Sequence, residues 1–289
     1  MTLRQLWRLT RPHTLSAAVV PVLVGTAAGA LSGRPSYALV FDMLLISLAL
    51  QVATNMANEY FDYRQGVDHA GLTGIAGVIV QGETSPKAVL TAAVATFGLA
   101  FVLGCLLAAA RGPLLVLLGL LSILVALLYS AGPRPISATP FGELTVLLLM
   151  GVLETLVSEV AAVGHLSLAA TAASLSVGFL VAAILTANNL RDRESDAERG
   201  RRTLAILLGA QRGLTFLRLE AVAAVVWPAI AAALGLMPWA AALTLALAPI
   251  AITVGRHGSL RRLLPEVSRL HLLNGLVLSL TLGLAALLR

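Results

Sequence analysis

Two short segments of this 289-residue chain carry asparagine and aspartate at spacings that suit a metal site. The first contains Asn55, Asn58, Asp62 and Asp68, and the second contains Asn188, Asn189, Asp192 and Asp196. Half of the chain's 14 Asp and Glu residues lie in these segments. Carboxylate and amide oxygens suit hard divalent cations, and Mg²⁺ shares its remaining coordination positions with substrate phosphates. We therefore expect a cation site that holds a phosphorylated ligand.

Helical spacing places most of the first segment on one face. Asn55, Asn58 and Asp62 follow an i, i+3, i+7 pattern, and successive residues of an α-helix turn by about 100°. Asp68 does not continue this face. Gly66 offers a break that would turn the chain and bring Asp68 back toward Asp62.

The second segment repeats the pattern, since Asn188, Asp192 and Asp196 are spaced i, i+4, i+8. One alternative is that both segments are solvated helix ends, although two matched segments make this alternative weaker than a single one would. Another is an ion pathway, but transport carboxylates usually lie at mid-bilayer depth, whereas these lie at the ends of apolar runs. A site formed by both segments is the favoured interpretation.

The composition is that of a polytopic helical membrane protein, with 58% hydrophobic and 12% charged residues. The single cysteine, Cys105, lies in an apolar run, so we expect a packing residue rather than a disulfide or a metal ligand. The net charge of +6 does not indicate nucleic-acid binding, because the basic residues lie between the apolar segments.

Nine apolar segments are long enough to cross a hydrocarbon core about 30 Å thick. We expect one all-α domain over residues 1–289 with spans at 14–32, 38–60, 87–109, 113–131, 143–163, 166–189, 214–234, 238–254 and 270–288. With the N-terminus in the cytoplasm, all but three of the 20 Lys and Arg residues (Arg34, Arg111 and Arg289) fall on the cytoplasmic side. The positive-inside rule therefore predicts an inner (plasma) membrane protein whose loops 58–86 and 188–213 face the cytoplasm.

A bound diphosphate would require positive charge beyond the metal ions. The basic residues at a suitable depth are Arg64, Lys87, Arg134, Arg191 and Arg193. Each has the alternative role of a lipid-headgroup contact or a topology signal. Tyr129 is similarly open, because it would either bind a phosphate oxygen or belong to an interfacial aromatic belt.

Several motifs together resemble the UbiA superfamily of intramembrane prenyltransferases, and within it the branch that prenylates dihydroxynaphthoate for menaquinone. The resemblance rests on Arg11–Ala27, Asn58–Asp68, "YSAGPRP" from Tyr129 with Gly142-Glu143, and above all Asn188–Gly209. It implies nine transmembrane helices around a lipid-open central cavity. It also implies two Mg²⁺ ions gripping a polyprenyl diphosphate whose prenyl group passes to an aromatic acceptor.

The resemblance also implies roles for individual residues. It implies metal ligands at Asn58, Asp62, Asp68, Asp192 and Asp196, of which Asn58, Asp62 and Asp192 are central to catalysis. Substrate contacts are expected from Asn55, Arg64, Tyr129, Arg134, Asn188, Asn189 and Arg191, with Lys87 as a further candidate. The segment after Asp68 is glycine-rich and apolar where relatives carry a basic residue, which leaves the cation that neutralises the diphosphate unassigned.

Two carboxylates inside the fifth predicted span, Glu154 and Glu159, depart from this pattern. Acidic residues within a span indicate function, but five residues apart these two do not share a face. One would orient the aromatic acceptor or accept a proton; alternatively, one or both lie in water at the far interface.

Two other functions remain open at this stage. The first is a related enzyme that uses another acceptor, such as hydroxybenzoate or a chlorin, or that cyclises the prenyl chain. The second is a secondary transporter of an anionic solute. A transporter predicts an inverted repeat, whereas the two acidic segments recur in the same orientation.

Overall fold

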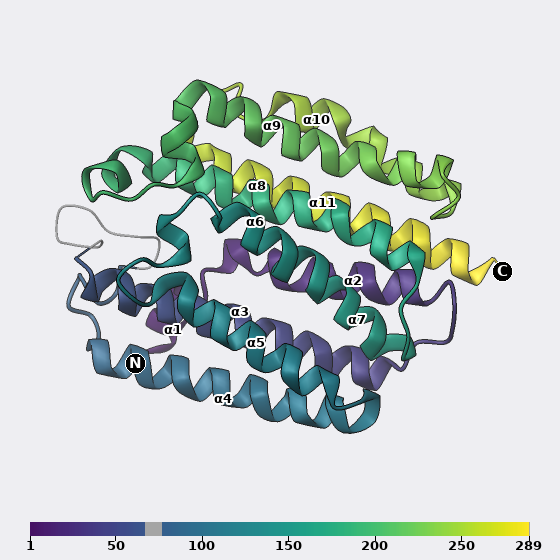
Figure 1. Cartoon of the computed structure of the whole chain (residues 1–289), viewed down its shortest axis with the longest axis horizontal. Helices are drawn as coiled ribbons and strands as arrows, with labels where there is room; N and C mark the ends of the chain where they lie inside the picture. Colours follow the sequence, from purple (N-terminus) through teal and green to yellow (C-terminus); the bar gives the residue numbers. More distant parts are fainter. Residues whose placement is uncertain (67–76, 289) are drawn as a thin grey trace.

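The computed structural model describes residues 1–66 and 77–288, and every regular element within these ranges is helical. The first half contains α1 (Leu3–Thr10), η1 (Pro12–Thr14), α2 (Ser16–Gly29), α3 (Tyr37–Arg64), α4 (Pro86–Arg111), α5 (Leu114–Ser130) and η2 (Ile136–Ala138). The second half contains α6 (Gly142–Val146), the π-helical η3 (Leu147–Leu153), α7 (Glu154–Val163), α8 (Leu168–Glu198), α9 (Leu204–Ala233), η4 (Trp239–Leu247), α10 (Ala248–Thr253) and α11 (Leu260–Leu287). The helices lie side by side in one bundle (Figure 1). The predicted all-α fold is confirmed.

Six helical stretches in the described ranges are long and apolar enough to cross a membrane: α3, α4, the continuous α6–α7 stretch, α8, α9 and α11. A seventh arises if the two N-terminal stretches, bent by 54°, form one span. The stretches Leu114–Ser130 and Trp239–Thr253 are apolar but shorter. The chain is therefore a multi-pass membrane protein, and the count of nine spans stays a prediction.

The 54° bend lies at Leu15, between Leu3–Thr14 and Ser16–Gly29. A separate turn precedes it at Arg11, which takes a left-handed conformation with φ of 49°. The backbone N–H of Arg11 bonds the carbonyl of Arg8 and ends α1. This turn sets Thr14 against α3, where its hydroxyl accepts from the Gln51 side chain at 3.2 Å.

The topology brings both acidic segments to one end of the bundle. The chain leaves α3, α5 and α8 at the same end, on the left of Figure 1, although these exits lie far apart in sequence. Gly66, with φ of 70°, follows the last turn of α3, as the expected break requires. Asp68 lies outside the described residues.

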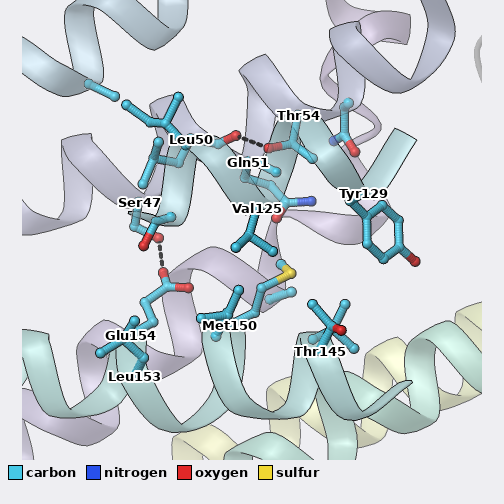
Figure 2. Close-up of a pocket in the computed structure, with 18 of the residues that line it drawn as sticks. Ser47, Leu50, Gln51, Thr54, Val125, Tyr129, Thr145, Met150, Leu153 and Glu154 are labelled. Carbon is cyan, nitrogen blue, oxygen red and sulfur yellow. Dashed lines mark hydrogen bonds between the residues drawn. The ribbon is translucent and has the colours of Figure 1, made fainter. Parts of the chain in front are cut away.

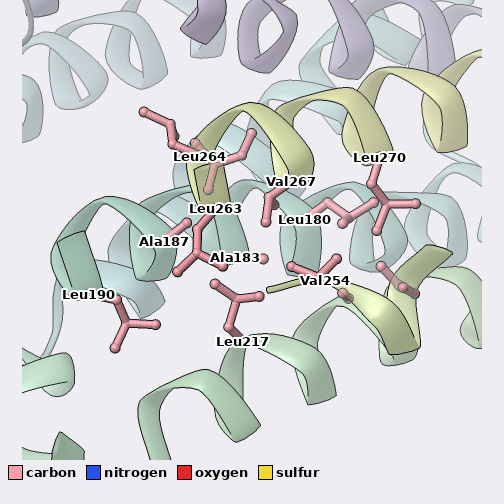
Figure 3. Close-up of a cluster of buried hydrophobic side chains, with 14 of the residues drawn as sticks. Leu180, Ala183, Ala187, Leu190, Leu217, Val254, Leu263, Leu264, Val267 and Leu270 are labelled. Atoms are coloured by element: carbon pink, nitrogen blue, oxygen red, sulfur yellow. The ribbon is translucent and has the colours of Figure 1, made fainter. Parts of the chain in front are cut away.

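Helix α8 holds the bundle together. It packs against α2, α9, α11 and η3. Figure 3 shows its Leu180, Ala183 and Ala187 meeting Leu217 of α9 and Leu263 of α11 in a buried apolar cluster. The position of the second acidic segment, at the end of α8, is therefore fixed by packing along the whole helix.

Close helix crossing beside this cluster depends on two glycines. Gly151 of η3 lies against the backbone of Gly178 in α8, and a Cβ at position 151 would overlap Gly178. Small residues allow such backbone approach in membrane bundles. The crossing fixes the wall of the α6–α7 stretch that faces α3.

Replacing Gly151 by Ala should destabilise the protein by about 1–3 kcal/mol, because the added methyl group has no space. Thermal unfolding in detergent, followed by circular dichroism, measures this loss. Gly98→Ala in α4 is the matched control, since a methyl group added there would meet no atom within 4 Å. Equal melting temperatures for the two variants would contradict the close crossing.

Candidate active site

A cavity of about 330 Å³ lies between α3, α4, α5, the α6–α7 stretch and α8, and we call it the chamber. Most of its wall is apolar, with side chains such as Ile123, Leu149 and Leu153. Its polar lining gathers where α3, α5 and α8 end, and we call this region the mouth; its residues are Asn58, Asp62, Tyr129, Ser130, Asn188, Asn189 and Arg201. The chamber thus joins an apolar interior to a polar, charged opening.

The first acidic segment lines the chamber as helical spacing predicts. Asn55, Asn58 and Asp62 all contribute to its wall. The amide group of Asn55 is already engaged, because its Nδ2 donates to the Thr10 carbonyl at 2.9 Å and to the Thr14 hydroxyl at 3.1 Å. The carbonyl oxygen of Asn58 accepts from the Ser130 hydroxyl. Asn55 therefore anchors the N-terminal turn, whereas Asn58 and Asp62 lie at the mouth.

The second acidic segment divides into separate contacts. Arg191 binds Asp192, with Nε to Oδ1 at 2.7 Å, and its Nη2 donates to Asn188 at 2.8 Å. Asn188 and Asn189 line the chamber. Asn189 donates to the buried Glu143 at 2.9 Å. Its partner lies in the first turn of α6, so this bond ties α8 to α6.

Arg201 connects the two segments. Its Nη1 lies 3.1 Å from Oδ1 of Asp196, and its Nη2 lies 3.8 Å from Oδ1 of Asp62. Its Nη2 also donates to the Ser137 hydroxyl at 3.3 Å. The three charged side chains are mostly buried, with exposed fractions of 16% for Arg201, 24% for Asp62 and 4% for Asp196. One guanidinium group therefore neutralises carboxylates from helices that are far apart in sequence.

The loop after α8 positions Arg201. Gly200 takes a φ of 74°, and the backbone N–H of Arg201 bonds the carbonyl of Asp196 at 3.1 Å. The next N–H, of Arg202, bonds the carbonyl of Ala138 at 2.8 Å. Sequence reasoning assigned Arg201 to membrane topology alone. Gly200 is the only local sequence signal of the turn that positions Arg201. The sequence does not show that α3 approaches this arginine.

The donor set at the mouth fits a hard cation in chemical type. Asp62 and Asp196 direct carboxylate oxygens at the Arg201 guanidinium group, and Asn58 and Asn188 line the chamber. These are all oxygen ligands, as Mg²⁺ prefers. Within residues 1–66 and 77–288, no three His, Cys, Asp or Glu side chains are grouped closely enough to hold a metal ion.

The other predicted cations lie elsewhere. Arg64 and Lys87 are exposed and line a separate shallow pocket rather than the chamber. Arg134 is exposed and does not contribute to the chamber wall. Of the described Lys and Arg residues, the two that line the chamber are Arg201 and Arg11, and Arg11 lies 3.7 Å from Oε2 of the buried Glu59. Sequence reasoning missed both as site residues.

The two carboxylates of the fifth span have different environments. Glu159 is fully buried, and its two oxygens accept from the backbone N–H of Ser167 at 3.0 Å and its hydroxyl at 2.5 Å. Because Ser167 is the N-cap of α8, Glu159 is a capping partner rather than a hydrated side chain. Glu154 lines the chamber and meets Ser47 of α3 across it (Figure 2). Only Glu154 of the two is placed to contact a ligand in the chamber.

Comparison with known proteins agrees with this arrangement. Residues 18–275 match the UbiA prenyltransferase family. The chain is 40% identical over 222 residues to a 1,4-dihydroxy-2-naphthoate octaprenyltransferase of Bacillus subtilis (strain 168), covering 77% of this chain and 71% of that protein.

Solved structures show the same fold. A UbiA homologue from Aeropyrum pernix K1 superposes with a TM-score of 0.70 at 20% identity, over 93% of this chain and 97% of the other. A UbiA homologue from Archaeoglobus fulgidus, bound to GPP and Mg²⁺, gives a TM-score of 0.62 at 18% identity, over 95% and 99% of the two chains. Family match, sequence identity and fold agree, and the chain belongs to the UbiA prenyltransferase family.

Proposed function

We propose that this protein transfers a polyprenyl group from its diphosphate to an aromatic acceptor, 1,4-dihydroxy-2-naphthoate, in quinone biosynthesis. The observation that carries the proposal is that Asp62 and Asp196 both pair with the Arg201 guanidinium group at the mouth of an apolar chamber. The naphthoate acceptor is favoured by the activity named for the B. subtilis relative. The A. fulgidus homologue bound to GPP and Mg²⁺ supports a prenyl diphosphate as the donor.

The mouth would hold two Mg²⁺ ions and the diphosphate. Asn58 and Asp62 with Asp68 would provide one set of ligands, and Asp192 with Asp196 the other. The ions supply Lewis-acid stabilisation of the charge that grows on diphosphate as the allylic C–O bond breaks.

Within the chain itself, Arg201 is the residue best placed to neutralise the diphosphate. Its guanidinium group lies at the mouth between Asp62 and Asp196. Arginine binds phosphate oxygens in a fork geometry with charge-assisted hydrogen bonds. When cations occupy the carboxylates, Arg201 would be released from them and would bind the diphosphate. Arg191, which already bridges Asp192 and Asn188, would support the second metal set.

The apolar chamber wall would receive the prenyl tail and exclude water. Side chains such as Leu118, Ile123 and Val157 line it. A dry wall protects an allylic cation from capture by water before the aromatic ring attacks. Tyr129, one of the residues of the mouth, would contact the diphosphate end of the donor.

We further propose that the protein lies in the cell inner (plasma) membrane and that the mouth faces the cytoplasm. The exits of α3, α5 and α8 lie at one end of the bundle (Figure 1), and the exit of α8 carries a run of arginines that includes Arg199, Arg201 and Arg202. A cytoplasmic mouth would give water-soluble aromatic acids direct access.

The direct test uses purified protein in liposomes with geranylgeranyl diphosphate, Mg²⁺ and either 1,4-dihydroxy-2-naphthoate or 4-hydroxybenzoate. We expect a prenylated naphthalene product and equimolar diphosphate release with the naphthoate. Release of diphosphate without any acceptor would instead indicate a cyclase. No release under any condition would contradict prenyl transfer.

Replacing Asp62 or Asp196 by Ala should lower turnover at least about 100-fold, because each change removes a metal ligand and one ion-pair partner of Arg201. Initial rates across a Mg²⁺ titration measure the loss, and EDTA should abolish the wild-type rate. Glu194→Ala is the matched control, since its carboxylate lies in the same helical segment and is 87% exposed. Near-normal rates for either Asp variant would refute the metal assignment.

Replacing Arg201 by Gln should have opposite effects on the two ligands. The KM for prenyl diphosphate should rise about 10–100-fold, the cost of losing charge-assisted hydrogen bonds. Mn²⁺ binding without substrate, measured by electron paramagnetic resonance as a probe of the Mg²⁺ site, should become tighter because a competing cation is gone. Arg202→Gln, at the exposed neighbouring position, controls for net charge. Weaker metal binding in Arg201→Gln would rule out competition between Arg201 and the metal.

A further inference from the structure

A stripe of polar side chains continues from the mouth into the apolar chamber. Ser47, Gln51 and Asn55 are spaced four residues apart on α3 and all line the chamber. Eight residues of α-helix rise about 12 Å, so Ser47 lies deep below Asn55. Glu154 faces Ser47 from the opposite side of this deep region (Figure 2).

The contacts of the Ser47 hydroxyl allow two protonation states of Glu154. The hydroxyl has a single proton but lies within hydrogen-bond distance of two oxygens, the Ala18 carbonyl at 2.8 Å and Oε1 of Glu154. If Ser47 donates to Oε1, Glu154 can be ionised, because the Ala18 carbonyl lies within α2. If Ser47 donates to Ala18, a neutral Glu154 can donate to Ser47, and substitution of Glu154 distinguishes the two states.

The second oxygen of Glu154 remains available. Oε2 makes no hydrogen bond among the described residues, and it is not sealed from the chamber. The neighbouring wall residues Met150 and Leu153 are apolar. An acceptor oxygen facing only a hydrocarbon tail would cost about 1–3 kcal/mol. A hydrocarbon tail would leave Oε2 of Glu154 without a hydrogen-bond donor, whereas a ligand with a hydroxyl group would supply one.

The backbone supports a ligand-binding role for this position. Glu154 directly follows η3, a π-helical turn inside an otherwise α-helical span. Such π-helical insertions are rare and often occur at functional sites. The adjacent crossing of Gly151 and Gly178 holds this turn against α8. The direction of the Glu154 side chain is thus set by two packed helices.

We propose that Glu154, held by Ser47, forms the deep end of the acceptor subsite and accepts a hydrogen bond from a ring hydroxyl of a hydroxylated aromatic acid. The inference rests on the proposed prenyl transfer. The acceptor's carboxylate would point toward the mouth, and the hydroxyl farther from it would reach Oε2 of Glu154. Glu154 acts in binding and orientation, and takes no proton from the substrate.

Two substitutions separate this role from simple packing. Glu154→Met removes the acceptor oxygen and should raise the KM for 1,4-dihydroxy-2-naphthoate about 10-fold, the effect of one lost buried hydrogen bond. Glu154→Gln should stay within about 3-fold of wild type, because an amide donates to Ser47 and accepts from the ligand. The KM for geranylgeranyl diphosphate should not change in either variant. Glu220→Met is the matched control, since Glu220 is buried, is bonded to the Thr186 hydroxyl at 2.8 Å and does not line the chamber.

A ligand lacking one hydroxyl completes the test without relying on turnover. Calorimetric binding of 1-hydroxy-2-naphthoate, which lacks the hydroxyl at position 4, should be about 10-fold weaker than that of 1,4-dihydroxy-2-naphthoate in wild type. The two ligands should bind Glu154→Met equally. This coupling isolates the contact even if Glu154→Met is less stable.

Several outcomes would overturn the inference while leaving prenyl transfer intact. One is an unchanged acceptor KM in Glu154→Met, and another is an equal loss of affinity for both ligands in that variant. If Glu154→Gln loses kcat as severely as Glu154→Met, the group acts as an ionised base and the neutral-acid role is wrong. Absence of prenyl transfer in the wild-type protein would be a failure of the proposed function itself.

Discussion

The arrangement of the site depends on the ion pairs that Arg201 makes with Asp62 and Asp196. Two carboxylates brought to one mostly buried mouth repel each other, and a membrane protein has little water there to screen them. A shared cation removes this penalty and allows the ends of α3 and α8 to approach. The same requirement makes the mouth selective, because any group that displaces Arg201 must itself be cationic. In the proposed function, metal binding would therefore be coupled to release of Arg201.

Helical periodicity was sufficient to predict the face of α3 that carries Asn55, Asn58 and Asp62, because a long regular helix preserves angular relations. Arg201 was not predictable in this way. Its place depends on the turn at Gly200 and on α3, which precedes it by more than 130 residues. The spacing of Glu154 and Glu159 showed that they occupy different faces, but not which face meets a cavity and which caps a neighbouring helix. The count of nine spans stays a prediction because α5 and the η4–α10 stretch are shorter than hydropathy alone indicated.

The packing of α8 explains how the second acidic segment, at the polar end of this helix, is held in place. Its apolar length is buried against α9 and α11 (Figure 3) and against α2, so the polar end cannot shift without disturbing the core. Interiors of this kind are close-packed, have low compressibility and transmit strain. The glycine contact between η3 and α8 extends this rigidity to the wall that carries Glu154. Mouth and deep chamber are thus positioned by one helix.

Carboxyl groups at the two ends of the chamber differ in environment more than in chemistry. At the mouth, Asp62 and Asp196 face the guanidinium group of Arg201. In the deep region, the hydrogen-bond partner of the Glu154 side chain among the described residues is the Ser47 hydroxyl. Between these two ends the chamber wall is mostly apolar, so the polar groups of α3 are the positions at which the chamber can orient a polar ligand.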